Sequence, residues 1–142
     1  MSRKQCLVEQ DTIGTPTYFS NFLLSDNSII NLQIYDTPGQ EKYRALIESY
    51  YKRADGIILV YDISNKESFK ECKNYFCENI KEKCKRDIKV ILVGNKSDLE
   101  EKREVSFQEA NDFASLNNYI HIQTSCLKNE NVFEAFEKII GI

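Results

Sequence analysis

Two short segments of this chain carry residues that could act on a phosphate group and on a purine base. Asp36-Thr37-Pro38-Gly39-Gln40 directly follows an apolar run, and Asn95-Lys96-Ser97-Asp98 follows another about sixty residues later. A carboxylate at a strand end can hold hydrated Mg²⁺, which prefers oxygen ligands and keeps several waters. Gly39 would let a backbone N–H approach a phosphoryl oxygen, and Gln40 could orient an attacking water. The alternative is an ordinary turn, since Asp, Pro and Gly are common turn formers.

The second segment has residue types suited to reading guanine. The Asp98 carboxylate could accept two parallel hydrogen bonds, from the N1–H and the amino group of the base. Adenine offers no such donor pair and would leave the carboxylate unpaired, which is the kind of mismatch that gives large discrimination. Lys96 could lay its methylene stem over the base. The competing interpretation is a polar loop with a helix cap.

The strands that must position these segments are visible as apolar patterns. Tyr18–Leu24 and Ile29–Tyr35, with a polar turn between them, predict an antiparallel hairpin. Gly56–Tyr61 and Lys89–Gly94 are continuous apolar runs, which favour parallel strands buried on both faces. Tyr119–Gln123 is predicted to be one more strand. The sequence thus predicts an antiparallel hairpin in the first part of the chain and buried parallel strands in the rest.

Helical segments separate the later strands. The longest spans residues 66–83, and Ser64-x-x-Glu67 and Ser106-x-x-Glu109 predict capping boxes at two helix starts. Asn131 is predicted to open the last helix. The side chains predicted to face the core are Phe69, Cys72, Phe76, Ile80, Ala110, Phe113, Ala114, Val132, Phe136 and Ile139.

Strand and helix alternate, which predicts an α/β fold with right-handed crossovers. Ligands of such open sheets bind at the carboxyl ends of the strands. Asp36, Asn95 and Ser125 are each predicted to lie just past a strand end. The candidate residues therefore fall where the fold would bring them together.

Composition narrows the class of protein. The length of 142 residues suggests one domain. The net charge is −3 and charges of both signs are interspersed, so the chain has no strong positive potential that would attract nucleic acid. Five cysteines without a C-x-x-C pair, and no signal peptide, indicate a reducing, intracellular compartment. No apolar run is long enough to span a bilayer, and we expect no encoded lipid anchor. His121, the only histidine, is expected to be a partly exposed strand residue.

Both motifs, in this order on successive strand ends, resemble the Ras superfamily and within it the Rab-type small GTPases. The resemblance runs from about Asp11 to Phe136. Asp11-Thr12-Ile13-Gly14 resembles switch I, and Glu41–Ala45 with the segment that follows resembles switch II. Thr124-Ser125-Cys126 resembles the last guanine-binding loop. The fold implied is a P-loop NTPase-like three-layer α/β fold with helices on both faces of the sheet.

The resemblance implies a role for each matching residue at the phosphate end. Thr12 would ligate Mg²⁺ and meet the γ-phosphate, and Asp36 would be the carboxylate that holds the metal through water. Gly39 would contact the γ-phosphate. Gln40 would position the water that attacks it, and is the catalytic candidate.

At the base end, the resemblance implies that Asn95, Lys96 and Asp98 hold guanine. Ser125 would brace this loop, and the Cys126 amide would face the guanine O6. The implied cofactors are GTP or GDP and Mg²⁺. The implied activity is hydrolysis of GTP to GDP, as a switch in vesicle traffic.

Partners would be effector, GTPase-activating and exchange-factor proteins. They would bind through the switch regions around Thr12–Tyr18 and Gln40–Tyr51. The expected location is cytoplasmic, and peripheral on intracellular membranes if the full-length parent is lipidated.

The chain also departs from the family. No Gly-x-x-x-x-Gly-Lys-[Ser/Thr] sequence occurs, so we expect the first strand, the P-loop and the first helix to be missing from a single, N-terminally truncated domain over residues 1–142. The missing strand would leave a gap between the strands ending at Asp36 and at Asp62. Pro38 stands where Ala is usual, and Leu127 where Lys is usual. The alternatives are a pseudo-GTPase that acts as a protein-interaction module, or an unrelated flavodoxin-like domain.

Overall fold

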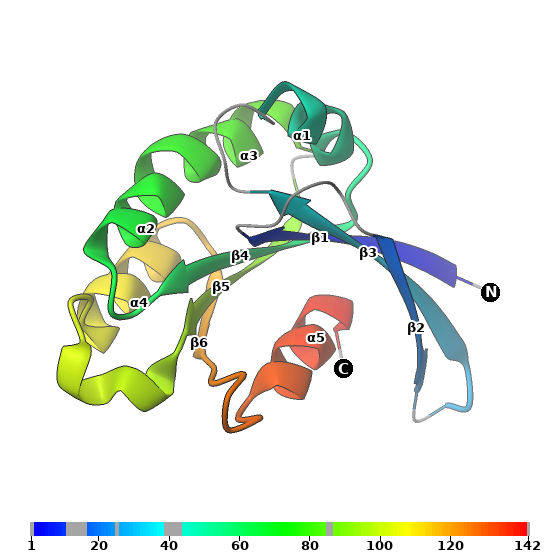
Figure 1. The fold of residues 1–142 in the computed structure, drawn as a ribbon. Coiled ribbons are helices and arrows are strands. Elements are labelled where there is room, and N and C mark those ends of the chain that lie inside the picture. The colour runs from blue at the N-terminus through cyan, green and yellow to red at the C-terminus, as the bar shows by residue number, and fades with distance from the viewer. Residues whose placement is uncertain (1, 11–16, 25, 39–43, 85–86, 142) are drawn as a thin grey trace.

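A six-stranded sheet forms the centre of the molecule (Figure 1). The computed structural model describes residues 2–10, 17–24, 26–38, 44–84 and 87–141. The strand order is β2-β3-β1-β4-β5-β6, with β2 antiparallel to β3 and all other neighbours parallel. The strands are β1 (Ser2–Gln10), β2 (Thr17–Leu23), β3 (Ile29–Pro38), β4 (Gly56–Asp62), β5 (Lys89–Asn95) and β6 (Ile120–Gln123).

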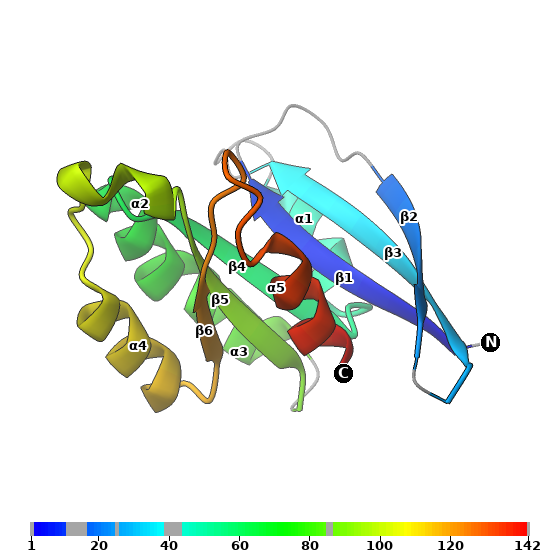
Figure 2. The same cartoon turned by 90° about the horizontal axis from the view of Figure 1, so that it is seen from below.

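Helices cover both faces of this sheet, as the sequence predicts. Helices α1 to α4 lie on one face and α5 lies on the other, where Figure 2 shows it running over the strands (Figures 1 and 2). The helical elements are α1 (Arg44–Tyr51), α2 (Lys66–Glu71), a π-turn (Cys72–Phe76), α3 (Cys77–Lys83), a 3₁₀-helix (Ser97–Lys102), α4 (Phe107–Leu116) and α5 (Val132–Ile140). None of the described helices has the length and apolar character needed to cross a bilayer.

The expectation that the central strand is missing is wrong. The segment Ser2–Gln10 forms β1 and occupies that central position, in parallel register with β3 on one side and β4 on the other. Its pairing runs from Ser2 opposite Ile30 to Gln10 opposite Pro38. The backbone groups that would have faced a gap are therefore paired, which removes the cost expected for two open edges.

The same pairing changes the position of Asp36. The sequence predicts a strand that ends at Tyr35, but β3 continues to Pro38 and contains both Asp36 and Thr37. Asp36 pairs with Val8 of β1, and Thr37 is fully buried. Asp36 therefore lies within β3, near its carboxyl end, and not beyond the strand. The hydrogen-bonded pairing with β1 extends the strand past the predicted end.

The predicted helical core faces are confirmed. Phe69, Cys72, Phe76 and Ile80 are all at most 5% exposed, although a π-turn interrupts the helix that carries them. They pack with Tyr61 and Leu59 of β4 in the larger of two apolar clusters. The smaller cluster lies under α5 and includes Ala135 and Ile139, with Phe136 partly buried beside it.

The predicted capping residues are confirmed at two of three helix starts. The Ser106 hydroxyl accepts from the Glu109 N–H at 3.0 Å, and Asn131 is the N-cap residue of α5. At α2 the predicted capping box is wrong. The cap is Asn65, whose side chain accepts from the N–H groups of the second and third helical residues, while Ser64 bonds to Asp62.

His121 is a partly buried strand residue, as expected. Its Nε2 lies 3.0 Å from the Tyr61 hydroxyl, and the Phe107 ring covers it from α4 at a centroid distance of 5.0 Å. Burial, with a smaller contribution from the charge of Arg103, lowers the pKa of His121 to about 4. The folded chain therefore keeps this imidazole neutral where the unfolded chain protonates it.

We expect this histidine to make the fold acid-sensitive. Because its folded pKa lies below the unfolded value of 6.5, the free energy of unfolding should fall as pH drops from about 6.5 to about 4. A shift of this size corresponds to about 3 kcal/mol, and partial solvation of the ring reduces our expectation to about 1–2 kcal/mol. Urea unfolding of the parent and of His121→Gln between pH 4.5 and 7 measures the difference. Parallel pH profiles for the two proteins would rule out this contribution.

Candidate functional site

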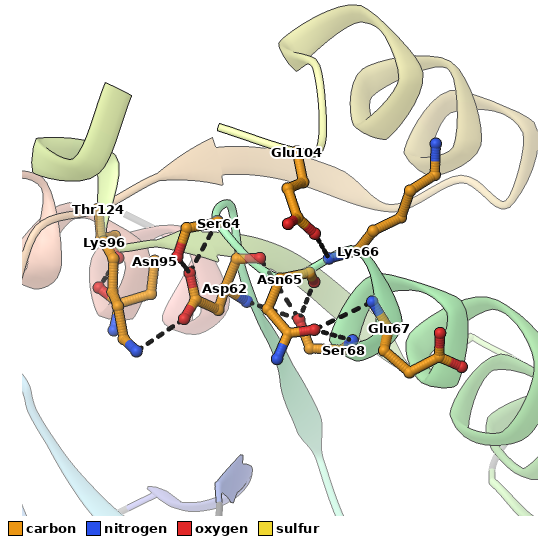
Figure 3. A network of polar contacts seen from close by, with 10 residues as sticks. All are labelled: Asp62, Ser64, Asn65, Lys66, Glu67, Ser68, Asn95, Lys96, Glu104 and Thr124. Carbon is orange, nitrogen blue, oxygen red and sulfur yellow. Dashed lines mark hydrogen bonds and ion pairs between the residues drawn. The ribbon is translucent and has the colours of Figure 1, made fainter. Parts of the chain in front are cut away.

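The candidate site is a group of loops at the carboxyl ends of β4, β5 and β6. Parallel pairing of these strands sets their ends at one edge of the sheet. Figure 3 shows the polar side chains that meet there, from the end of β4, the start of α2 and the loop after β5. The site is thus assembled from segments that are far apart in the chain. Its outermost members in sequence, Asp62 and Thr124, are more than sixty residues apart.

Asn95 and Lys96 mark the change from strand to loop. Asn95 is the last residue of β5, where it pairs with Asp62, and its Oδ1 accepts from the Thr124 hydroxyl at 3.1 Å. Lys96 follows with a left-handed backbone, φ 61°, which turns the chain sharply out of the sheet. The Ser97 N–H then donates to the Thr124 carbonyl at 3.0 Å. The loop is therefore tied to the segment after β6 on both sides of the turn.

Lys96 makes an ion pair that the sequence did not predict. Its ammonium lies 2.6 Å from Asp62 Oδ2, while Asp62 Oδ1 accepts from the N–H and hydroxyl of Ser64 at 2.8 and 2.7 Å (Figure 3). Partial burial by itself favours the neutral acid, but the hydrogen bonds from Lys96 and Ser64 outweigh it and lower the pKa of Asp62. The carboxylate thus remains charged at neutral pH and holds the lysine ammonium at the end of β4.

Asp98 is held by the residue predicted to brace it. The Ser125 hydroxyl donates to Asp98 Oδ1 at 2.5 Å and accepts from the Lys128 N–H at 3.1 Å. Ser125 is fully buried, and its backbone exchanges two hydrogen bonds with Glu130. Within the described part of the chain, no side chain or backbone group bonds to Asp98 Oδ2. The carboxylate is oriented from one side and has acceptor capacity left.

A small cavity of about 90 Å³ lies under these loops. Asn95, Thr124 and Cys126 line its polar end, and apolar side chains of β4, β5 and α5 line the rest. It is too small to enclose a nucleotide, since ligand pockets usually measure about 300–1,000 Å³. The described loops therefore present an open edge and not a closed pocket. A larger hollow of about 570 Å³ lies elsewhere, lined by the first residues of β5 and β6.

The predicted site residues divide into two groups. Those at the base-reading end lie together: Asn95, Lys96, Asp98, Ser125 and Cys126, the last of them exposed. Those at the phosphate end are only partly described. Thr12, Gly39 and Gln40 lie outside the described residues, and so does most of the first predicted switch region. Of the second region, the structure describes the part that forms α1.

Asp36 is the one metal candidate that the structure describes. It lies near the carboxyl end of β3, the same edge of the sheet as the loops above. Mg²⁺ is usually held by one or two carboxylates, with waters and substrate phosphates completing the shell, so a single carboxylate fits this ion. The described residues contain no group of three or more His, Cys, Asp or Glu side chains that could hold a metal by themselves.

Sequence reasoning missed two functional neighbours, Asp62 and Thr124. Asp62 follows a continuous apolar run, which is the same signal that drew attention to Asp36 and Asn95. Thr124 was taken only as part of a loop, yet its hydroxyl and carbonyl bind Asn95 and Ser97. Both residues act by positioning the loop after β5.

The arrangement can present a fixed carboxylate, an amide and a lysine stem to one planar ligand. Asn95, Lys96 and Asp98 each have a bond to a neighbouring element, so little side-chain freedom remains to be lost on binding. A carboxylate with free acceptor capacity suits a ligand edge with two parallel N–H donors.

Comparison with known proteins identifies the family of this chain. The Ras family model matches residues 6–141. Rab-11A of Dictyostelium discoideum is 39% identical over 94% of this chain and 62% of its own length. Rab-4 of the same organism is 44% identical over 77% of the chain and 53% of its own length. The GTP-binding protein ypt3 of Schizosaccharomyces pombe is 42% identical over 92% of the chain and 60% of its own length. The chain thus spans about half to two thirds of these relatives.

Proposed function

Because this chain belongs to the Ras family and is a Rab-type small GTPase, we propose that its loops after β5 and β6 form the guanine-binding part of a nucleotide switch. In this proposal Asp98 reads the N1–H and amino group of the base, Lys96 lies across its face, and Asn95 holds the loop to Thr124. Ser125 braces Asp98, and the Cys126 amide faces the guanine O6.

The observation that carries the proposal is the hydrogen bond from Ser125 to Asp98. This bond joins two loops that are 27 residues apart, and it comes from a fully buried hydroxyl. It fixes the carboxylate of Asp98 before any ligand arrives. Pre-orientation of this kind lowers the entropy cost of binding and favours one hydrogen-bonding pattern over another.

The test is a titration of the ¹⁵N-labelled chain with millimolar GDP or ADP. GDP should shift the amide signals of the loops over 95–98 and 124–126, and ADP should leave them unchanged. The reason is that only guanine offers Asp98 two parallel donors. Asp98→Ala should abolish the shifts caused by GDP.

Asp87→Ala is the matched control, because it also removes a carboxylate but lies in the turn before β5, at the opposite end of that strand. This variant should respond to GDP as the parent does. Equal shifts with ADP and GDP, or shifts that survive in Asp98→Ala, would contradict the proposal.

The remaining functions belong to the same proposal. Thr12, Asp36 and Gly39 would hold Mg²⁺ and the γ-phosphate, and Gln40 would position the hydrolytic water. The parent protein would hydrolyse GTP to GDP as a switch in vesicle traffic, peripheral on intracellular membranes. It would bind effectors, activating proteins and exchange factors through the two switch regions. Residues 1–142 would form one GTPase domain.

A second candidate follows from the sequence. No Gly-x-x-x-x-Gly-Lys-[Ser/Thr] segment occurs in the 142 residues, so the usual grip on the β-phosphate is absent from this chain. A pseudo-GTPase that binds protein partners without turning over nucleotide would need no such grip. Base-selective shifts by GDP would favour the guanine-binding function over this one.

A further inference from the structure

Strand β2 is an edge of the sheet with an unusual composition. Within the described ranges it pairs only with β3, so its other side carries backbone groups that no described strand satisfies. Its seven residues, Thr-Tyr-Phe-Ser-Asn-Phe-Leu, include no charge and no proline. Edge strands of soluble proteins usually carry lysine, proline or a bulge that blocks further pairing. Strand β2 contains no lysine and no proline, and its continuous pairing with β3 has no bulge.

The side chains of β2 are also exposed to an extent that is uncommon for their type. Tyr18 and Leu23 are 55% and 68% exposed, and they lie on opposite faces of the strand. Phe22 is the one buried side chain, stacked on Phe133 of α5 at a centroid distance of 5.4 Å. Phe133 itself is 62% exposed. The edge and the α5 side next to it therefore form one apolar surface.

We propose that β2 pairs with β2 of a second copy of this chain, antiparallel and centred on Ser20, so that the two sheets join into one. In this register Ser20 meets its own copy, Tyr18 meets Phe22, Phe19 meets Asn21, and Thr17 meets Leu23. Each copy gives and receives the same contacts, as a twofold interface requires. The pairing would add about six to eight backbone hydrogen bonds.

The aromatic residues support this register. Residues 18, 20 and 22 share the face of β2 that points to α5, because side chains alternate along a strand. The second copy's Tyr18 would lie directly opposite Phe22 and extend the stack that Phe22 makes with Phe133. Cross-strand aromatic pairs of this kind contribute beyond simple burial. The absence of charge on β2 means that no like charges oppose each other in the self-pairing.

The geometry also limits the assembly to two chains. Twofold pairing uses the β2 edge of both copies, and among the described strands the edge that remains in each copy is the four-residue strand β6. A short edge offers little template for further pairing. Because one pair of strands buries less area than a standard interface, we expect a dissociation constant on the order of 10–100 μM.

Sedimentation velocity of the full chain at about 5 to 500 μM tests the proposal, since this range brackets the expected constant. The mass should rise from that of a monomer to that of a dimer and stop there. Ser20→Lys should keep the protein monomeric over the whole range, because two lysines would meet on the axis. Leu116→Lys is the matched control, as it places the same charge at an 86% exposed apolar residue at the end of α4, and it should dimerise like the parent. Circular dichroism checks that both variants fold. Tyr18→Lys is a second variant that should prevent dimerisation.

A disulfide experiment tests the register independently. In a Cys126→Ser background, which removes the one exposed thiol among the cysteines whose side chains the structure describes, Ser20→Cys should form a cross-linked dimer on mild oxidation. Directly opposed residues of antiparallel strands fall within the Cα separation that a disulfide spans. Asn21→Cys should cross-link far less, because it would face Phe19. A monomer at every concentration, a mass that grows beyond two chains, or equal dimerisation of Ser20→Lys and the parent would overturn the proposal.

Discussion

The 142-residue chain should bind GDP·Mg²⁺ only weakly, with a dissociation constant in the high micromolar to millimolar range. Asp98, Lys96 and Asn95 offer a few hydrogen bonds at about 1 kcal/mol each net, which gives this order of affinity. A Gly-rich phosphate loop would add several charge-assisted bonds, at about 1.5–3 kcal/mol each, and no such loop occurs in the sequence. Four such bonds are worth about 6–12 kcal/mol, or a factor of about 10⁴ to 10⁸.

Titration calorimetry with guanosine, GMP and GDP separates the two contributions. If the base provides the affinity, the three ligands should bind within about threefold of each other, because the phosphates find no built site. GDP that binds a hundredfold more tightly than guanosine, or with a nanomolar constant, would show that the chain has a phosphate site that its sequence does not reveal. ADP serves as the ligand that should not bind.

Replacing Asp98 by Asn should reverse the choice of base. The carboxylate offers two acceptors to the N1–H and amino group of guanine, whereas the amide offers one acceptor and one donor. That donor suits the 2-oxo group of xanthine, so preference should move from GDP to XDP by at least about 100-fold, which corresponds to about 3 kcal/mol. The bond from Ser125 is made to a single oxygen of Asp98, and an amide oxygen can still accept it. The loop geometry should therefore persist in the variant.

This measurement needs tight binding, which a chimera can supply. A strand and Gly-rich phosphate loop from a Rab-type relative would replace residues 2–10, since β1 already occupies the central position in the sheet. Competition between GDP and XDP then reports the preference. Ser125→Ala is the control, because loss of the brace should weaken both nucleotides without exchanging their order. A chimera in which Asp98→Asn still prefers GDP would exclude Asp98 as the residue that reads the base.

Much of this architecture could be read from local patterns. The continuous apolar runs at 56–61 and 89–94 predicted buried parallel strands, and both are strands whose interiors are buried. The period of 3.6 residues between apolar side chains identified the buried face of the helix over 66–83. This was possible because the pattern is visible within a short stretch of sequence. The polar residues after each strand then located the loops that we propose to bind guanine.

Local patterns were insufficient where a choice depended on distant neighbours. Ser64 and Asn65 are both good caps, and the sequence favoured Ser64 on spacing. Asn65 caps α2 because Ser64 bonds instead to the Asp62 carboxylate, which turns it away from the helix. The end of β3 was likewise misplaced by three residues, since only the ladder with β1 extends that strand to Pro38.

The sequence by itself indicated the family, the order of the strands and helices after β1, and the residues that we propose to read guanine, because these depend on short motifs and on the period of apolar residues. The tertiary structure decided which residues support those motifs. It placed Ser2–Gln10 in the centre of the sheet, where the sequence led us to expect that a strand is missing. It also brought Asp62 within 2.6 Å of Lys96, 34 residues later in the chain. Contacts of this kind arise only when parallel strands align their ends, and no local pattern encodes that alignment.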